Sequence, residues 1–291
     1  MTFSHSFQLF TNTPCTQVRV DDGSYIVQTP RGEIRASHVV HATNGWSSHL
    51  LPGMRKRVIP LRGHMSTQRP GQGLAPESTS RAFVFYPSNH PFAFDYLTQL
   101  LPQNQSSLPS HQEMMYGGGA ILGGVSEDVL FENLGISDDS GTQFQIEAYL
   151  AGSLQRYFGE HWGAEGVEIQ EEAESGWEKG RVKALWSGII ALSSDTLPWV
   201  GRVPKIVSGR NEPAPRASSA PLAPPGEWIS AGYNGEGMTQ AWLCGDAVAS
   251  MILNEDSTRA NPFQLPPAFL ITEKRVKKAT FEDLMAKFLA E

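Results

Sequence analysis

Two glycine-containing turns are the places in this sequence where a ligand could be held. Residues 228–238, WISAGYNGEGM, predict a strand that ends at Gly232, a glycine-rich turn, and a helix that begins near Glu236. Gly235 and Gly237 would let the backbone approach a ligand closely, and the helix start would offer unpaired N–H groups at its positive end. Such a turn suits an anionic or electron-accepting group. The alternative is a strand-to-helix turn that needs small residues only for packing.

A second turn follows the run HVVHATNGW, which predicts a short strand of a parallel sheet. Thr43 and Asn44 offer polar groups where that strand ends. Ligands of open α/β sheets bind at the carboxyl ends of strands, so the two turns could line one crevice although they are distant in the sequence. Further along, Asp195 follows an apolar strand. Its carboxylate could bind a ligand hydroxyl or close an Asx-type turn.

Several motifs that would point to other chemistry are absent. The sequence contains no GxGxxG, no GxxxxGK[ST] and no GxSxG. Residues 117–124, GGGAILGG, fit none of these patterns and predict a tight hairpin or a bulged strand. His38 and His41 would face opposite sides of a strand, and the two cysteines lie far apart. We therefore predict no metal site.

Composition narrows the class of partner. The chain has 291 residues and a formal net charge of −7, from 23 Lys and Arg against 30 Asp and Glu, which argues against a nucleic-acid partner. No apolar run reaches the roughly 18 residues that span a bilayer, so we expect no membrane partner. Only Cys15 and Cys244 are present, which favours a reducing, cytoplasmic compartment. A small molecule is the expected partner.

The periodicity predicts the elements that position these turns. Apolar residues recur every four positions over residues 142–162 and predict a helix there. A second helix is expected from the glycine-rich turn to about residue 253, and a last one from about residue 272. Residues 208–226 are rich in Pro, Ala and Ser, so they predict a surface insertion that does not pack.

Several motifs, in order along most of the chain, resemble the D-amino-acid-oxidase-like (DAO) family of FAD-dependent oxidoreductases, and its fungal members most closely. FTNTPCTQVRV resembles the strand whose backbone holds the adenine, and HVVHATNGWSSHLLP resembles the ATN(G/A)-W motif. VIPLRGHM is similar to the crossing into the substrate domain, and FDYLTQLLPQ and MMYGGGAILGG to the sheet of that domain. LWSGIIALSSDTLPWVGRVP and EWISAGYNGEGMTQAWLCGDAVASMIL resemble the return into the FAD domain.

The resemblance implies an α/β (α+β) fold with two parts. One is a partial Rossmann-like FAD/NAD(P)-binding domain, and the other is a substrate domain with a mainly antiparallel sheet. The implied boundaries are a remnant of the FAD-binding domain over 1–57, a substrate domain over 58–184, a return into the FAD-binding domain over 185–255 with a flexible insertion at 208–226, and a tail helix over 256–291.

The same resemblance implies site residues. FAD would be non-covalent, because residues 186–194 contain no cysteine where members with covalent flavin have one. The implied FAD-binding residues are Cys15, Thr43, Asn44, Gly45, Trp46, Asp195, Asn234, Gly235, Glu236, Gly237 and Met238. The candidates on the substrate side are Arg62, His64, Tyr96, Gln99 and Trp186. Arg62 in a structural ion pair and Tyr96 as a packed strand residue are alternatives that need no substrate.

One departure from the family is large. The family begins with a strand, GxGxxG and a helix that grip the FAD phosphates, whereas this sequence starts at what resembles a later strand. The implied function is oxidation of a C–N bond of an amine or amino acid, by hydride transfer to FAD, in an N-terminally truncated form. A partner chain could supply the missing FAD-binding segment. The alternatives are a non-catalytic relic or binding protein that no longer holds FAD, and an unrelated binding module.

Overall fold

The computed structural model describes residues 7–70, 74, 80–87, 93–100, 113–119, 127–162, 180–214, 222–254 and 265–288. Residues 120–124 of the glycine-rich segment and 215–221 of the expected insertion lie outside this part of the chain. The chain divides into two compact units. The first comprises Met1–Ile59 with Ala191–Lys287, and the second comprises Pro60–Ile190 with Phe288–Glu291.

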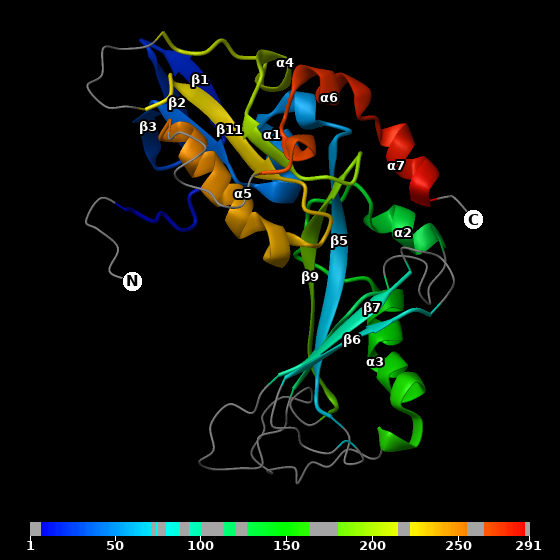
Figure 1. Ribbon diagram of the computed structural model, residues 1–291. Helices are drawn as coiled ribbons and strands as arrows, with labels where there is room; N and C mark the ends of the chain where they lie inside the picture. Colours follow the sequence, from blue (N-terminus) through cyan, green and yellow to red (C-terminus); the bar gives the residue numbers. More distant parts are fainter. Residues whose placement is uncertain are drawn as a thin grey trace. The chain divides into compact units, whose positions relative to one another are not determined.

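A three-stranded sheet forms the centre of the first unit (Figure 1). Its order is β10 (Trp199–Arg202), β11 (Gly226–Ala231) and β4 (His38–His41). β11 pairs with β4 in parallel, which confirms the predicted parallel strand, and with β10 antiparallel. All six residues of β11 are buried, as expected for a central strand covered on both faces. The core around it contains Leu51, Met54, Val58, Trp199, Val207, Ile229 and Ala231.

The same unit contains an antiparallel meander and several short helices. The meander consists of β1 (Gln17–Asp21), β2 (Ser24–Thr29) and β3 (Gly32–Ala36). Asp22 and Gly23 both have positive φ, the conformation that two-residue hairpin turns favour. The helical segments after β4 are η1 (Asn44–Trp46), α1 (Ser47–Leu50) and η2 (Pro52–Met54), and α4 (Lys205–Ser208) follows β10. The predicted helix after the glycine-rich turn is confirmed as α5 (Gly237–Ile252).

The C-terminal tail contains two helices where the sequence predicts a single one. η5 (Pro267–Phe269) precedes α6 (Glu273–Lys278) and α7 (Phe281–Phe288). The break occurs because Ala279 is extended and Thr280 starts a new helix, with its Oγ1 accepting the Asp283 N–H at 3.2 Å. None of the helices in the described ranges is long and apolar enough to cross a bilayer.

The second unit is built on a five-stranded sheet in the order β6, β7, β8, β5 and β9. Its strands are β5 (Val58–Gln68), β6 (Arg81–Phe85), β7 (Asp95–Gln99), β8 (Met114–Gly117) and β9 (Val182–Ser193). The β6–β7, β7–β8 and β5–β8 pairs are antiparallel. α2 (Glu127–Asn133), α3 (Phe144–Phe158) and η3 (Gly159–His161) complete the described elements of the unit. The predicted α/β (α+β) class with an antiparallel second sheet is therefore confirmed.

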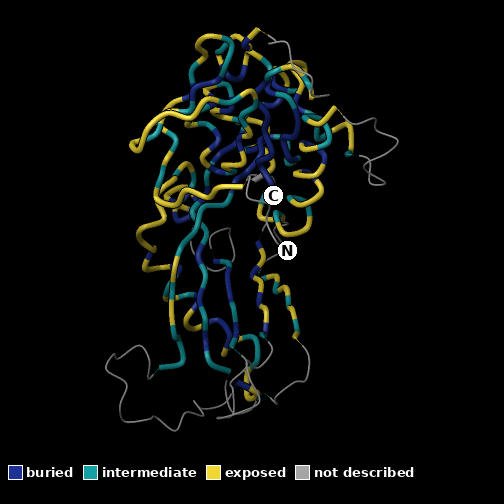
Figure 2. Tube along the Cα trace, turned by 90° about the vertical axis from the view of Figure 1, so that its left-hand side faces the viewer, coloured by how far each residue is buried: buried dark blue, intermediate teal, exposed yellow. Residues whose placement is uncertain are grey.

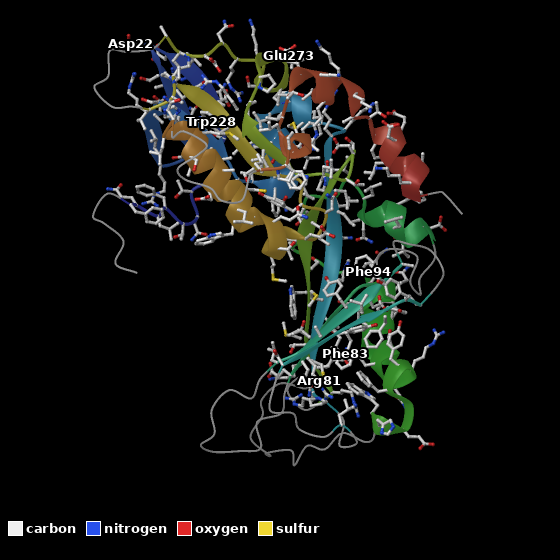
Figure 3. The ribbon with its side chains drawn as sticks, in the orientation of Figure 1. Asp22, Arg81, Phe83, Phe94, Trp228 and Glu273 are labelled. Atoms are coloured by element: carbon white, nitrogen blue, oxygen red, sulfur yellow. The ribbon has the colours of Figure 1, made fainter. Side chains whose placement is uncertain are left out.

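α3 covers one face of the five-stranded sheet. Ile146, Leu150 and Leu154 are fully buried at a spacing of four, which confirms the predicted helix. β7 alternates strictly between buried and exposed residues. Figure 2 shows the burial of the described residues along the chain. Phe83 lies on the covered face, with its ring edge-on to Phe158 at 5.8 Å between centroids (Figure 3). Consequently every second strand residue faces α3, and its neighbours face the opposite side.

Candidate functional site

The two predicted turns meet in the first unit. Because β4 and β11 are parallel neighbours, their carboxyl ends lie side by side. The Asn44 side chain joins them, since its Oδ1 accepts a hydrogen bond from the Gly232 N–H at 3.0 Å. Asn44 has a φ of 43°, a left-handed conformation that asparagine tolerates better than most residues. Two segments that are far apart in the sequence therefore form one structural corner.

Asn234 connects the end of β9 to the same corner. Its Oδ1 accepts the Ser193 N–H at 2.7 Å, and its Nδ2 donates to the Gly232 carbonyl at 3.1 Å. Its own N–H donates to the Ala191 carbonyl at 2.8 Å. Asn234 and Gly235 both have positive φ, so the backbone reverses tightly before α5. Three strand ends are thus fixed relative to one another by side-chain amides.

The N-terminus of α5 is open at this corner. The N-cap residue Glu236 makes no side-chain hydrogen bond to the first turn, and the Thr239 N–H donates to the Glu236 carbonyl at 3.1 Å. Gly237 begins the helix, and a Cβ there would meet only Tyr233, at 3.9 Å. Glu236 is exposed and Met238 fully so. The donor set and the accessible backbone fit an electronegative group such as the pyrophosphate or the flavin ring of FAD.

The second half of the corner is the 3-10 turn after β4. The Trp46 N–H donates to the Thr43 carbonyl at 2.9 Å, and Ser47 Oγ donates to the Asn44 carbonyl at 2.8 Å. Gly45 is buried, whereas 42% of the Trp46 surface is exposed. Thr43 is exposed as well, and its Oγ1 lies 3.3 Å from the Ser47 hydroxyl. Thr43 and Trp46 are therefore accessible to a ligand, whereas Gly45 is buried in the same turn.

Two other predicted cofactor residues are placed differently. Arg275 engages both carboxylate oxygens of Asp195, at 2.7 and 2.9 Å. Burial acts to raise the pKa of Asp195, but Arg275 and the hydrogen bonds from Ser193 and Leu197 outweigh it, so the pKa lies below its usual value. Cys15 lies just before β1, and burial raises the pKa of its thiol. Among the described residues, no hydrogen bond joins Cys15 to either turn.

The substrate-side candidates divide between the two faces of the five-stranded sheet. Tyr96 alternates with residues that face α3, so it lies on the opposite face, where 36% of its surface is exposed. Trp186 is 37% exposed and follows Leu185, which packs against the α3 cluster. Both rings are accessible on the face away from the helices.

The other three candidates form hydrogen bonds on the face of the sheet that α3 covers. Arg62 Nε donates to Asn133 Oδ1 at 2.9 Å, and Gln99 is buried and accepts from Arg81 Nε at 2.9 Å. His64 is 2% exposed and accepts the Gln143 N–H at 3.0 Å. Burial, followed by the nearby charge of Arg62, lowers the pKa of His64 to about 4, so it is neutral near pH 7. These contacts are of the kind expected for structural residues.

Two polar residues that shape these sites, Arg275 and Asp95, were not among the predicted site residues. Arg275 is eighty residues from Asp195, and no local pattern connects them. Asp95 is fully buried, and the alternation in DYLTQ would have placed it on the same face as Leu97. A charged residue on the apolar side of a strand is the signal that could have identified it.

Replacing Asn44 with alanine should destabilise the chain by about 2 kcal/mol, because it removes the bond to Gly232 and puts at positive φ a residue that tolerates this conformation less well than asparagine. Asn44→Gly accepts the backbone conformation and loses only the side chain, so we expect about half that cost. Urea unfolding measures both. Equal costs for the two variants would show that backbone strain contributes nothing at this position.

Comparison with known proteins gives a consistent picture. The sequence matches the model of the family described as FAD dependent oxidoreductase (DAO) over residues 4–251. Glycine oxidase from Geobacillus kaustophilus has a TM-score of 0.55 and 18% identity, over 91% of this chain and 53% of that one. Fructosyl amine:oxygen oxidoreductase (Amadoriase I) from Aspergillus fumigatus has a TM-score of 0.52 and 11% identity, over 92% and 50%.

The two structures establish a shared fold, and the chain spans about half the length of each. No protein among those of curated function matches the chain.

Proposed function

Because the chain belongs to the DAO family of FAD-dependent oxidoreductases, we propose that it takes part in the oxidation of a C–N bond of an amine or amino acid with non-covalent FAD. The two structures that share its fold are named for glycine and for a fructosyl amine. The observation that carries the proposal is the hydrogen bond between Asn44 and Gly232, which holds both turns beside the uncapped start of α5.

In this proposal the corner of the first unit holds the cofactor. Thr43, Trp46 and the turn from Asn234 to Met238 would contact it, with Asn44 and Gly45 shaping the backbone. Bound FAD would accept a hydride from the carbon beside the substrate nitrogen. The helix dipole of α5 and the backbone N–H groups at its start would favour the negative charge that the flavin gains. Asp195 would act indirectly, by holding its own loop in place. The predicted contact of the Cys15 backbone with the adenine is untested and stays a prediction.

Tyr96 and Trp186 are the residues of the second unit that we propose to face the substrate. Both present aromatic rings on the sheet face away from α3, and such rings bind apolar groups and alkylammonium ions. Arg62, His64 and Gln99 would support this sheet from behind, since Arg62 Nε, His64 Nε2 and Gln99 Oε1 each have a hydrogen-bond partner within the unit.

Further parts of the proposal concern the whole protein. We propose that the first unit is the FAD-binding part and the second the substrate part, with the unit boundaries after residues 59 and 190 close to those expected after residues 57 and 184. β4 is an edge strand of its sheet among the described strands, and 48% of Val40 is exposed there. A further FAD-binding segment, in the same protein or on a partner chain, would pair with that edge. Kinship with the fungal members and a cytoplasmic compartment also stay predictions.

Flavin content tests the proposed function. The chain should bind FAD, either alone or together with the further FAD-binding segment proposed above. Acid denaturation should release the bound FAD. Gly237→Leu should reduce bound flavin at least about tenfold, because the new side chain fills the open start of α5. Gly245→Leu is the matched control, since it lies on the same helix with no atom within 4 Å of its Cβ position, and it should retain flavin.

Two outcomes would contradict the proposal. Equal flavin in both variants would place the cofactor elsewhere. If the protein stayed colourless with excess FAD and with the further FAD-binding segment present, the result would favour the alternative function, a non-catalytic binding protein that no longer holds FAD.

A further inference from the structure

The glycine run at the end of β8 separates two crowded faces of the second unit. A Cβ at Gly117 would collide with the Met65 thioether and lie 2.7 Å from the Tyr96 ring. At Gly118, with a φ of 137°, it would collide with the Asp95 carboxylate. At Gly119, with a φ of 70°, it would lie 2.8 Å from the Tyr149 ring. A side chain at any of the three positions would force a neighbour to shift, and Gly117 and Gly118 make room for Tyr96 and Asp95, respectively.

Asp95 is the centre of a buried cluster on the α3 side. It is fully inaccessible to solvent, and its Oδ2 accepts hydrogen bonds from the hydroxyls of Tyr116 at 3.0 Å, Tyr157 at 2.9 Å and Tyr149. Its Oδ1 accepts the Gly119 N–H at 2.9 Å. Tyr149 and Tyr157 come from α3, whereas Tyr116 comes from β8. One carboxylate thus fastens β7 to both the neighbouring strand and the covering helix.

The direction of these hydrogen bonds is fixed. Burial, and next the charge of Asp95, raise the pKa of Tyr116, and burial raises the pKa of Tyr149 and Tyr157 as well. The three phenols stay protonated at neutral pH, so each can donate to the carboxylate. Hydrogen bonds to an ionised acceptor are the stronger class. The cluster is consequently a rigid anchor for the backbone of residue 95.

Tyr96 is the next residue and faces the other side of the same strand. It pairs with Gly117 across β7 and β8, and its ring lies over that glycine beside Met65. A shift of the Asp95 backbone would therefore move the Tyr96 ring directly.

We propose that Asp95 is a positioning residue for Tyr96, acting from the covered face of the sheet through the glycine run. This inference rests on the proposed function, in which Tyr96 faces the substrate.

Fluorine NMR of the full chain, labelled with 3-fluorotyrosine at position 96, tests the proposal without any turnover. The wild type should give one narrow resonance. Asp95→Asn keeps the shape of the side chain but removes its charge and adds a donor among three phenol donors, so the Tyr96 resonance should broaden or split. Leu150→Ala is the control: it also weakens α3 packing, from a fully buried position whose apolar side chain cannot donate a hydrogen bond to the carboxylate. Both are compared at a temperature where circular dichroism shows a folded chain.

The outcomes separate the two proposals. An unchanged Tyr96 line in Asp95→Asn, or the same change in Leu150→Ala, would overturn the positioning role whatever the flavin content. If the protein were colourless, and the Tyr96 resonance broadened or split in Asp95→Asn but not in Leu150→Ala, the flavin function would be wrong and the positioning role would stand. In flavin-loaded protein, Asp95→Asn should raise KM for the amine more than it lowers kcat. An unchanged KM would contradict the link between Tyr96 and the substrate.

Discussion

Replacing Arg275 with methionine should lower the free energy of unfolding by on the order of 3 kcal/mol, because it leaves the largely buried Asp195 carboxylate without its cation. Arg275 also donates to the carbonyls of Leu197, Pro198 and Phe269, each at 2.8 Å. Its guanidinium lies 3.7 Å above the Trp199 ring. Methionine keeps part of the stacking and removes every hydrogen bond. Urea unfolding followed by tryptophan fluorescence measures the difference.

Lys277→Met provides the matched control on the same helix. Its Nζ is 3.4 Å from Glu273 in a pair with both side chains mostly exposed, so the cost should stay under about 0.5 kcal/mol. Similar losses in the two variants would refute the role assigned to Arg275.

The Arg275 effect should depend on pH. Because the pKa of Asp195 is below its usual value in the folded chain, the pair stabilises the fold above the ordinary aspartate pKa and loses that contribution as pH falls through the lowered value. The gap between wild type and Arg275→Met should therefore shrink below about pH 4. A gap that stays constant into acid would show that stacking on Trp199, and not the ion pair, carries the effect.

Glu227→Leu should cost about 3–5 kcal/mol, because the buried Glu227 is the shared acceptor of the buried His41 and the half-buried Arg210. Its carboxylate lies 2.7 Å from His41 Nε2, and Arg210 donates to both its oxygens at 2.7 and 2.8 Å. Burial acts to raise the pKa of Glu227, but Arg210 and His41 outweigh it, so this contribution is also lost on acidification. Thermal unfolding near neutral pH should show the full effect.

Glu212→Leu removes a comparable carboxylate from an exposed site. Glu212 pairs with Arg202 at 2.8 Å with 49% of its side chain accessible, so we expect a change below about 1 kcal/mol. If Glu227→Leu destabilised the chain as little as Glu212→Leu, the stabilising role assigned to Glu227 would be wrong, because leucine packing would have compensated for the lost ion pairs.

Local patterns predicted the parts of the fold that depend on periodicity. The spacing of Ile146, Leu150 and Leu154 identified α3, and the runs before Asn44 and Gly232 identified two strands, which the structure pairs in parallel. Face assignment in β5 was harder. Its residues alternate within a strand that packs on both sides, so the sequence did not tell which side Arg62 and His64 would occupy.

Long-range pairs were beyond the reach of sequence patterns. Asp195 and Arg275 are 80 residues apart in the sequence, and His41 and Glu227 are 186 residues apart. Nothing in the local sequence around these residues indicates that they pair. The tail was predicted as one helix because its apolar periodicity continues. The capping pattern from Thr280 to Asp283 would have marked the break.

The bond between Asn44 and Gly232 has a thermodynamic consequence for recognition. Because one amide joins the two bends, neither can relax alone, and a molecule that orders one bend lowers the entropic cost of ordering the other. Hydrogen exchange at the Gly232 amide should therefore slow even for a ligand fragment that touches only the Thr43 side, so that this single proton reports occupancy of the entire corner.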